Sequence, residues 1–519
     1  MIILTKKKIF NINLFYIINL GLYSFLVNFY YSKLGSFPID TFLHYDSAYR
    51  ILTGDLPIKD YWIVSGLTVD FIQSLFFKIF GTSWFAYSLH SSVFNLVITI
   101  SAYLFFIKIN LKKYKAFLFS ICLATLSYTI SGTPFVDLHA TYFLLLATLI
   151  IMININNNNQ YLWVIVTFLF FLSFFSKQVP ASYAAVANFF ILLFYFIFNR
   201  YFRNIFTIFA SSTVVVISIF IFLKLYDIDF ENFYIQYFDY PISIGQSRFI
   251  EISFVDFFNK FKFIILPLIF VTILKIKKNK DNIFSDEIVS FIIFLIFSII
   301  LIFHQVMSKN QIYIYFLIPI IFGLLEIEII KSKIKFKKYV SIILIFTLIF
   351  ITLKYHLRYN ENRKFHELNK TQLNETSDTG KIHKSLIGNK WINPSYDGNS
   401  SDEIEILSKV QNKLNNDFED KIMIISNYLF LDSITKKKLN GPNRTFTIDG
   451  NSIPIPGSKH FEYYKSYLQK KIIKKNINQI IFIKHENIPK EIISNYIGKE
   501  CYNTKDGEIF YIMELKCLN

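Results

Sequence analysis

Residues with acid–base chemistry lie between residues 32 and 83, after the first apolar run of the sequence. This stretch carries Asp40, Asp46, Asp55 and Asp60 among its aspartates. If residues 40–52 form a helix on the membrane surface, i, i+4 spacing puts Asp40 and His44 on one face. A carboxylate close to the bilayer can act as a general base toward a group presented at that depth. The alternative is an acidic, solvated loop in which Asp40 caps the helix.

The same stretch contains a second spaced pair and several aromatic residues. Asp46 and Arg50 are also four residues apart, so we expect them to pair on another face of the helix. Aromatic side chains often anchor helices in the interface between lipid and water. The residues expected to do so here are Phe42, Tyr45, Tyr49 and Trp62.

Isolated ionisable residues at the ends of later apolar runs are further candidates. Lys177 lies in a very short connection between two runs; it either has a function or extends its ammonium group to the membrane surface. Arg248 is either functional or a solvated loop charge. His304 and Lys309 flank another turn, where the alternative role is interfacial anchoring. Asp137 precedes a run and could instead be its N-cap.

A membrane-embedded helical bundle must position these residues. Hydrophobic residues make up 53% of the chain and charged residues 18%, against about 25% charged in ordinary globular proteins. A bilayer requires roughly 17–25 apolar residues of helix. About eleven runs come close to this length: 9–31, 84–107, 116–131, 138–153, 161–176, 179–198, 205–225, 261–274, 288–304, 311–325 and 339–353. We therefore predict an α-helical polytopic membrane protein, which excludes disordered chains, disulfide scaffolds and simple cytosolic enzymes.

The charges between these runs predict the orientation of the chain. Lysine and arginine concentrate in alternate connections, namely 6–8, 108–115, 200–203, 275–280 and 331–338. Positive short loops mark the cytoplasmic side. We expect a cell-membrane (inner-membrane) protein with a cytoplasmic N-terminus and an extracytoplasmic C-terminal part. The net charge of +17 is then mostly a topology signal, and nucleic acid is not an expected partner.

The chain divides into three predicted parts. Residues 1–354 form the transmembrane catalytic bundle, with the outer loop 32–83. Residues 355–416 form a polar linker, and residues 417–519 a small extracytoplasmic α/β domain. Its expected strands are 421–426, 479–484 and 508–515, and its expected helices are 459–475 and 488–497.

Two of the three cysteines, Cys501 and Cys517, lie in this last domain. A tight hairpin turn predicted at residues 504–507 puts Cys501 opposite Phe510. At ~3.4 Å per residue, Cys517 is then over roughly 20 Å away, too far for a disulfide.

An ordered series of motifs resembles the opening of the GT-C membrane glycosyltransferases, which include protein O-mannosyltransferases and aminoarabinose transferases. Asp40 follows the first span, a short helix ends in RILTG at residues 50–54, and Pro57 and Asp60-Tyr61-Trp62 follow. Ser65-Gly66 and LFFKIFG at residues 75–81 complete the series. The resemblance covers the first hundred residues. Thr41 stands where the family often has a second acidic residue. The residues of any metal site are therefore unknown, and a divalent cation remains an open alternative as cofactor.

The resemblance implies transfer of a sugar from a polyprenyl-phosphate donor to a hydroxyl of a glycan, lipid or protein acceptor, with inversion. Asp40 would be the general base, with Asp46 and Asp137 as further catalytic carboxylates. Residues that would bind the donor phosphate are Lys177, Arg248, His304 and Lys309. Residues that would line the substrate loop are His44, Arg50, Asp60 and Trp62.

Two other functions remain open at this stage. A polysaccharide (O-antigen) polymerase or ligase also works in glycan assembly, but typically has its large outer loop late in the chain. A transporter of lipid-linked sugars predicts charges at mid-membrane depth and internal repeats. The apolar runs are nearly free of charge, which favours the glycosyltransferase.

Overall fold

The computed structural model describes residues 2–36, 38–246, 253–278, 284–307, 314–333, 335–369, 372–419, 421–447, 449–486 and 488–517. The candidates Arg248 and Lys309 lie outside these residues. The chain forms two compact units. Unit 1 comprises Met1–Lys33, Ser88–Ser218 and Ile250–Lys370, and unit 2 comprises Leu34–Tyr87, Ile219–Phe249 and Thr371–Asn519.

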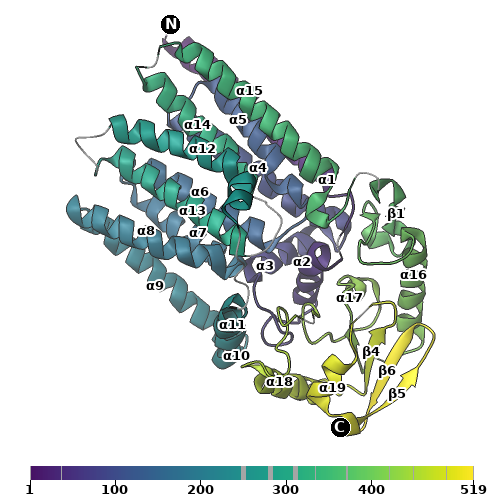
Figure 1. Cartoon of the computed structure of the whole chain (residues 1–519). Coiled ribbons are helices and arrows are strands. Elements are labelled where there is room, and N and C mark those ends of the chain that lie inside the picture. The colour runs from purple at the N-terminus through teal and green to yellow at the C-terminus, as the bar shows by residue number, and fades with distance from the viewer. Residues whose placement is uncertain are drawn as a thin grey trace. The chain divides into compact units, whose positions relative to one another are not determined.

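Unit 1 is a helical bundle whose successive long helices alternate in direction (Figure 1). Its long helices are α1 (Ile2–Tyr31), α4 (Trp84–Lys108), α5 (Lys113–Leu126), α6 (Val136–Asn157), α7 (Gln160–Ser176), α8 (Gln178–Phe198), α9 (Phe202–Leu225), α12 (Phe254–Lys278), α13 (Asp286–Met307), α14 (Leu317–Lys331) and α15 (Lys337–Tyr355). Both α4 and α9 run from one unit into the other. The shorter turns are η1 (Tyr128–Ile130), η3 (Ile314–Phe316), η4 (His356–Glu361) and η5 (Lys364–His366).

Each predicted apolar run coincides with a helix of the structure. Among the described residues, 8 helices are long and apolar enough to cross a membrane. The shorter helices α5, α7 and α14 overlap the predicted runs 116–131, 161–176 and 311–325. The predicted multi-pass helical fold is confirmed.

The burial of the helices in unit 1 separates its centre from its periphery. In the apolar window of α6, 83% of residues are buried within the protein, against 0% for α9. Helix α6 packs on α7, α8 and α13. Asparagines shape the turn between α6 and α7: Asn158 takes a left-handed φ of 51°, and the Asn159 side chain accepts from Tyr161 N at 2.9 Å.

Unit 2 combines short helices with a four-stranded sheet. From the first half of the chain come α2 (Pro38–Leu52), α3 (Leu67–Phe80), α10 (Phe230–Tyr234), η2 (Ile235–Asp239) and α11 (Tyr240–Gln246). The C-terminal helices are α16 (Ser400–Asn416), α17 (Leu431–Ile434), α18 (Phe461–Lys474) and α19 (Glu491–Ile497), with the short turns η6 (Gln372–Glu375), η7 (Thr379–Lys381), η8 (Lys384–Leu386) and η9 (Lys499–Cys501). The strands are β1 (Ser377–Asp378), β2 (Lys390–Trp391), β3 (Ile422–Ile425), β4 (Gln479–Ile483), β5 (Tyr502–Asp506) and β6 (Phe510–Leu515).

The main sheet of unit 2 has the strand order β3-β4-β6-β5. Strands β3 and β4 are parallel and the other pairs antiparallel. The three strands predicted from the sequence correspond to β3, β4 and β6. Strand β5 pairs with β6 through a turn that lies further along the chain than predicted, because Asp506 pairs with Tyr511.

Residues 32–83 and the C-terminal part share hydrophobic cores inside unit 2. Phe42 and Tyr45 of α2 pack in one core with Leu407 of α16, which lies in the segment predicted as a linker. Phe42, Tyr45 and Trp62 are all at most 1% exposed, so their prediction as interfacial anchors is wrong. Trp62 instead packs edge-on against Tyr240 and Tyr464, at 5.6 and 5.2 Å between ring centroids. The compact units therefore follow other boundaries than the three predicted parts.

Candidate functional site

Three predicted site residues of unit 1 meet at one carboxylate. Asp137 Oδ1 lies 2.6 Å from Lys177 Nζ and 2.9 Å from His304 Nε2. Asp137 lies in the first turn of α6, Lys177 between α7 and α8, and His304 near the end of α13. Because these helices alternate in direction, the three residues lie at the same end of the bundle, which we call the Asp137 end.

The environment of Asp137 argues against a simple capping role. The N-cap of α6 is Phe135, so the alternative prediction that Asp137 is the N-cap is wrong. The Asp137 side chain is 1% exposed and that of Lys177 20%. A buried carboxylate requires a partner of opposite charge, and Lys177 supplies it. Since an ammonium group has three N–H donors, Lys177 can hold Asp137 and a second acceptor at the same time.

A chain of buried hydrogen-bonding groups continues from α6. His139 lies two residues beyond Asp137, and its Nε2 is 3.0 Å from His90 Nε2 of α4. Its Nδ1 makes a close hydrogen bond with the hydroxyl of Tyr128. All three side chains are fully buried. His90 and Tyr128 were not among the predicted site residues, because neighbouring serines and threonines do not set either one apart in the sequence.

The proposed base, Asp40, lies in the first turn of α2 in unit 2 and is half-buried. The predicted helix over 40–52 is confirmed, since α2 covers Pro38–Leu52. His44, one turn further on, is fully buried, and its Nδ1 lies 2.6 Å from Asp70 Oδ1. Its place is therefore in the packing of α2 against α3, the helix that contains Asp70.

Arg444 of the C-terminal part joins α2 to residues 65–70. Its guanidinium donates to Ser47 Oγ at 3.0 Å and to Ser65 O at 2.5 Å. It also forms an ion pair with Asp70, so His44, Asp70 and Arg444 make one buried network. The sequence provides no signal for Arg444, because basic residues are common throughout the tail.

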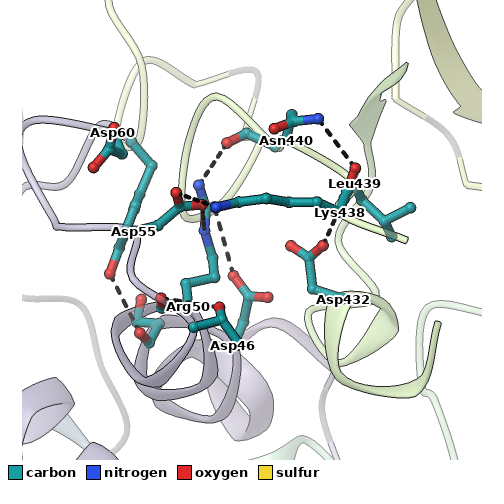
Figure 2. Close-up of polar contacts among 12 residues, drawn as sticks. Asp46, Arg50, Asp55, Asp60, Asp432, Lys438, Leu439 and Asn440 are labelled. Atoms are coloured by element: carbon teal, nitrogen blue, oxygen red, sulfur yellow. Dashed lines mark hydrogen bonds and ion pairs between the residues drawn. The ribbon is translucent and has the colours of Figure 1, made fainter. Parts of the chain in front are cut away.

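A second buried network of unit 2 surrounds Arg50, as Figure 2 shows. The predicted pair is present, with Arg50 Nη1 3.8 Å from Asp46 Oδ2, and Arg50 Nε lies 3.9 Å from Asp55. Arg50 also donates to Gly441 O at 2.8 Å and stacks on Tyr61. Burial raises the pKa of Asp46 to about 8, although Arg50 opposes that change.

Residues of the tail complete the network around Arg50 (Figure 2). Lys438 Nζ lies 2.6 Å from Asp55 Oδ1, and Leu439 N donates to Asp432 Oδ1 at 2.9 Å. Burial opposes ionisation of Asp55, but Arg50 and Lys438 outweigh it and lower its pKa. Burial raises the pKa of Asp432. Every group of this network that Figure 2 labels has a protein partner nearby, which is typical of a structural cluster.

The remaining predicted residues have local roles. Asp60 Oδ2 accepts from Leu56 N at 2.9 Å and so closes a turn of the loop. Trp62 is part of the core described above. Within the described ranges, no three histidine, cysteine, aspartate or glutamate residues form a group that could hold a metal ion.

Comparisons with known proteins identify similar solved structures only. No family model and no curated protein matches the chain. ArnT from Cupriavidus metallidurans, solved with undecaprenyl phosphate bound, is 9% identical with a TM-score of 0.48, covering 97% of this chain and 98% of that chain. The oligosaccharyltransferase AglB from Archaeoglobus fulgidus, in complex with an inhibitory peptide and a dolichol-phosphate, is 10% identical with a TM-score of 0.43, covering 98% and 75%. The Archaeoglobus fulgidus oligosaccharyltransferase in the apo form is 11% identical with a TM-score of 0.44, covering 94% of this chain and 73% of that chain.

At these low identities and TM-scores, we transfer neither residues nor activity from the solved structures to this chain. The assignment of function below therefore starts from the side chains of the chain itself.

Proposed function

We propose that this protein is a membrane glycosyltransferase that moves a sugar from a polyprenyl-phosphate donor to a hydroxyl acceptor. The observation that carries the proposal is the meeting of Lys177 and His304 at Asp137, at the end of an apolar helical bundle. A lysine at such a position can bind the anionic group of a ligand whose apolar chain lies in the membrane. The ordered motifs of the first hundred residues support the same conclusion.

In the proposed reaction, the acceptor hydroxyl attacks the anomeric carbon of the sugar while the bond from that carbon to the phosphate oxygen breaks. The hydroxyl proton goes to the Asp40 carboxylate, and polyprenyl phosphate leaves with its electron pair. Attack opposite the leaving group inverts the anomeric centre. A carboxylate is a suitable general base for this proton.

The leaving phosphate needs cationic donors, because negative charge builds up on it as the bond breaks. We assign this role to Lys177, assisted by His304. Asp137 holds both donors in place through its carboxylate. Charge-assisted hydrogen bonds of this kind are the strong ones in proteins. The donor is a polyprenyl-phosphate sugar, and the acceptor class is a glycan, lipid or protein hydroxyl.

Release of polyprenyl phosphate from lipid-linked sugars by the purified protein tests the proposal. Asp40→Asn keeps the shape of the side chain but removes its basicity, so turnover should fall by about 10²–10⁴-fold. The matched control is Asp402→Asn, which changes an exposed aspartate in the first turn of α16. This control should keep full turnover.

Two outcomes would contradict the proposal. If the wild-type protein releases no polyprenyl phosphate from any lipid-linked sugar in the presence of acceptors, the proposed activity is wrong. If the wild type is active and Asp40→Asn equals it, the activity stands but the base is another residue.

A further inference from the structure

The two C-terminal cysteines lie beside each other in the structure, contrary to the prediction from the sequence. Strands β5 and β6 pair from Tyr502 with Leu515 to Asp506 with Tyr511, and Gly507 N donates to Phe510 O at 2.9 Å. The turn is thus displaced toward the C-terminus relative to the predicted 504–507. The pairing brings the two ends of the hairpin together.

The contacts at the open end of this hairpin bring the two thiols together. Lys516 N donates to Cys501 O at 2.8 Å, so the ladder continues one residue beyond β5. The Cys517 thiol donates to Glu500 O at 3.9 Å. The neighbouring Cys517 thiol raises the pKa of the Cys501 thiol, in agreement with the closeness of the two side chains. A disulfide needs sulfurs about 2 Å apart. Cys517 directly follows Lys516, the residue whose N–H donates to Cys501 O.

We propose that Cys501 and Cys517 are a site of covalent modification, at which a disulfide oxidant of the glutathione or thiol–disulfide oxidoreductase class forms an intrachain bridge. Cys517 is exposed and Cys501 half-buried, so an oxidant reaches Cys517 first. The third cysteine, Cys122, is buried in α5 of unit 1 and takes no part.

The reaction balances as an exchange. The Cys517 thiolate attacks one sulfur of the oxidant, a mixed disulfide forms, and the other sulfur leaves as a thiolate. The Cys501 thiolate then attacks the Cys517 sulfur and expels the remaining oxidant sulfur. The protein loses two protons and two electrons, and the oxidant becomes two thiols.

The bridge would tie the end of the chain into the sheet. Strand β6 lies between β4 and β5, so loss of its C-terminal end would open the interior of the sheet. A crosslink across the hairpin reduces the freedom of the unfolded chain and thereby stabilises the fold. Disulfides persist in oxidising compartments, which agrees with the expected extracytoplasmic position of this part.

Thiol counting in the full-length protein tests the site. A Cys122→Ala variant is incubated with oxidised glutathione, denatured in SDS, and treated with a polyethylene-glycol maleimide with or without prior reduction. We expect no gel shift without reductant and two additions after reduction. Matched Cys501→Ser and Cys517→Ser variants in the same background should each lose the bridge, and reduction should lower the Tm of the bridged protein only.

The alternative outcomes overturn the proposal. Two maleimide additions without reductant, after incubation with oxidised glutathione, would show that the thiols do not bridge. A reductant-sensitive dimer in place of the intrachain form would show that the thiols pair between copies.

Discussion

The two ends of the unit 1 bundle both bury charged side chains, but they balance them differently. At the end opposite Asp137, Lys115 of α5 pairs with Glu326 and donates to Ser341 Oγ at 2.5 Å. Lys275 there lies 2.9 Å from Glu328 and 3.1 Å from Glu287. At the Asp137 end, one carboxylate meets both a lysine and a histidine.

The two ends are separated by the length of the helices. Glu287 begins α13 and His304 ends it, so they are about 25 Å apart at 1.5 Å per residue. Lys115 has one carboxylate partner and Lys275 has two, and Glu287 also pairs with Lys278 and Lys331. Asp137 instead faces one lysine and one histidine. We propose that the Lys115–Glu326 pair holds helices together, whereas the lysine and the histidine at the Asp137 end serve an anionic ligand.

The largest effect is expected from breaking a matched pair. Lys115→Met leaves Glu326 buried without its cation and should destabilise the protein by about 3–5 kcal/mol. Thermal unfolding in detergent measures this loss. Replacing both partners, in Lys115→Met with Glu326→Met, should restore most of the stability. If the double variant is as unstable as Lys115→Met alone, the interpretation of Lys115 and Glu326 as a purely structural pair is wrong.

The next effect concerns function, and thermal unfolding is measured beside it because Lys177 is also the partner of the buried Asp137. Lys177→Ala should lower the rate with the polyprenyl-phosphate sugar by about ten- to a hundredfold. The substitution removes a charge-assisted contact worth about 1.5–3 kcal/mol. Lys177→Arg should lose less, since it keeps the charge. Initial rates over a range of donor concentrations measure the difference. Wild-type rates in both variants would assign Lys177 to anchoring at the membrane surface.

His304→Gln should have a smaller effect at the same site. The glutamine amide can still donate to Asp137, so the hydrogen bond is kept and only the positive charge of a protonated imidazole is lost. We expect a few-fold loss of turnover, in line with about 0.5–1.5 kcal/mol for one hydrogen bond. The same rate assay measures it. A loss larger than that of Lys177→Ala would make His304 the principal hydrogen-bond donor to the phosphate.

The Arg50 network of unit 2 extends the comparison to a cluster rich in carboxylates. The folded-state pKa of Asp46 is raised to about 8 from its usual 3.8, so the folded protein holds this proton more tightly than the unfolded chain. The resulting contribution to the free energy of unfolding is fully present below about pH 4 and is lost as the pH rises through 8. Asp46→Asn should remove this part of the pH dependence and raise the Tm by a few degrees at pH 8.

Thermal unfolding of both proteins at pH 5 and pH 8 measures this smallest effect. The expected turnover of Asp46→Asn is close to wild type, as for a closed structural cluster. An inactive but stable variant would instead support the catalytic role suggested by the resemblance.

Much of the fold follows from the sequence, because long apolar runs allow few structures in a membrane. The candidates Asp137, Lys177 and His304 could each be identified by their position at the end of such a run. Their meeting at one carboxylate could not, because it depends on how α6, α7, α8 and α13 pack. Linear spacing contains no information on that packing.

Unit 2 was harder to predict, because its cores join distant parts of the chain. Tryptophan is a residue type typical of interfacial anchors. Trp62 N nevertheless donates to Pro442 O of the tail at 2.8 Å. The cysteine prediction failed for a local reason. A turn displaced by a few residues changes the partner of every residue in the hairpin, and brings Cys501 next to Cys517.

Binding of undecaprenyl phosphate to the purified protein tests most directly whether the Asp137 end serves an anionic ligand. The wild type, Lys177→Ala and the double variant of Lys115 and Glu326 are compared at one pH and detergent concentration. We predict that only Lys177→Ala weakens the affinity, by about ten- to a hundredfold. Equal affinity of Lys177→Ala and the wild type would contradict the account.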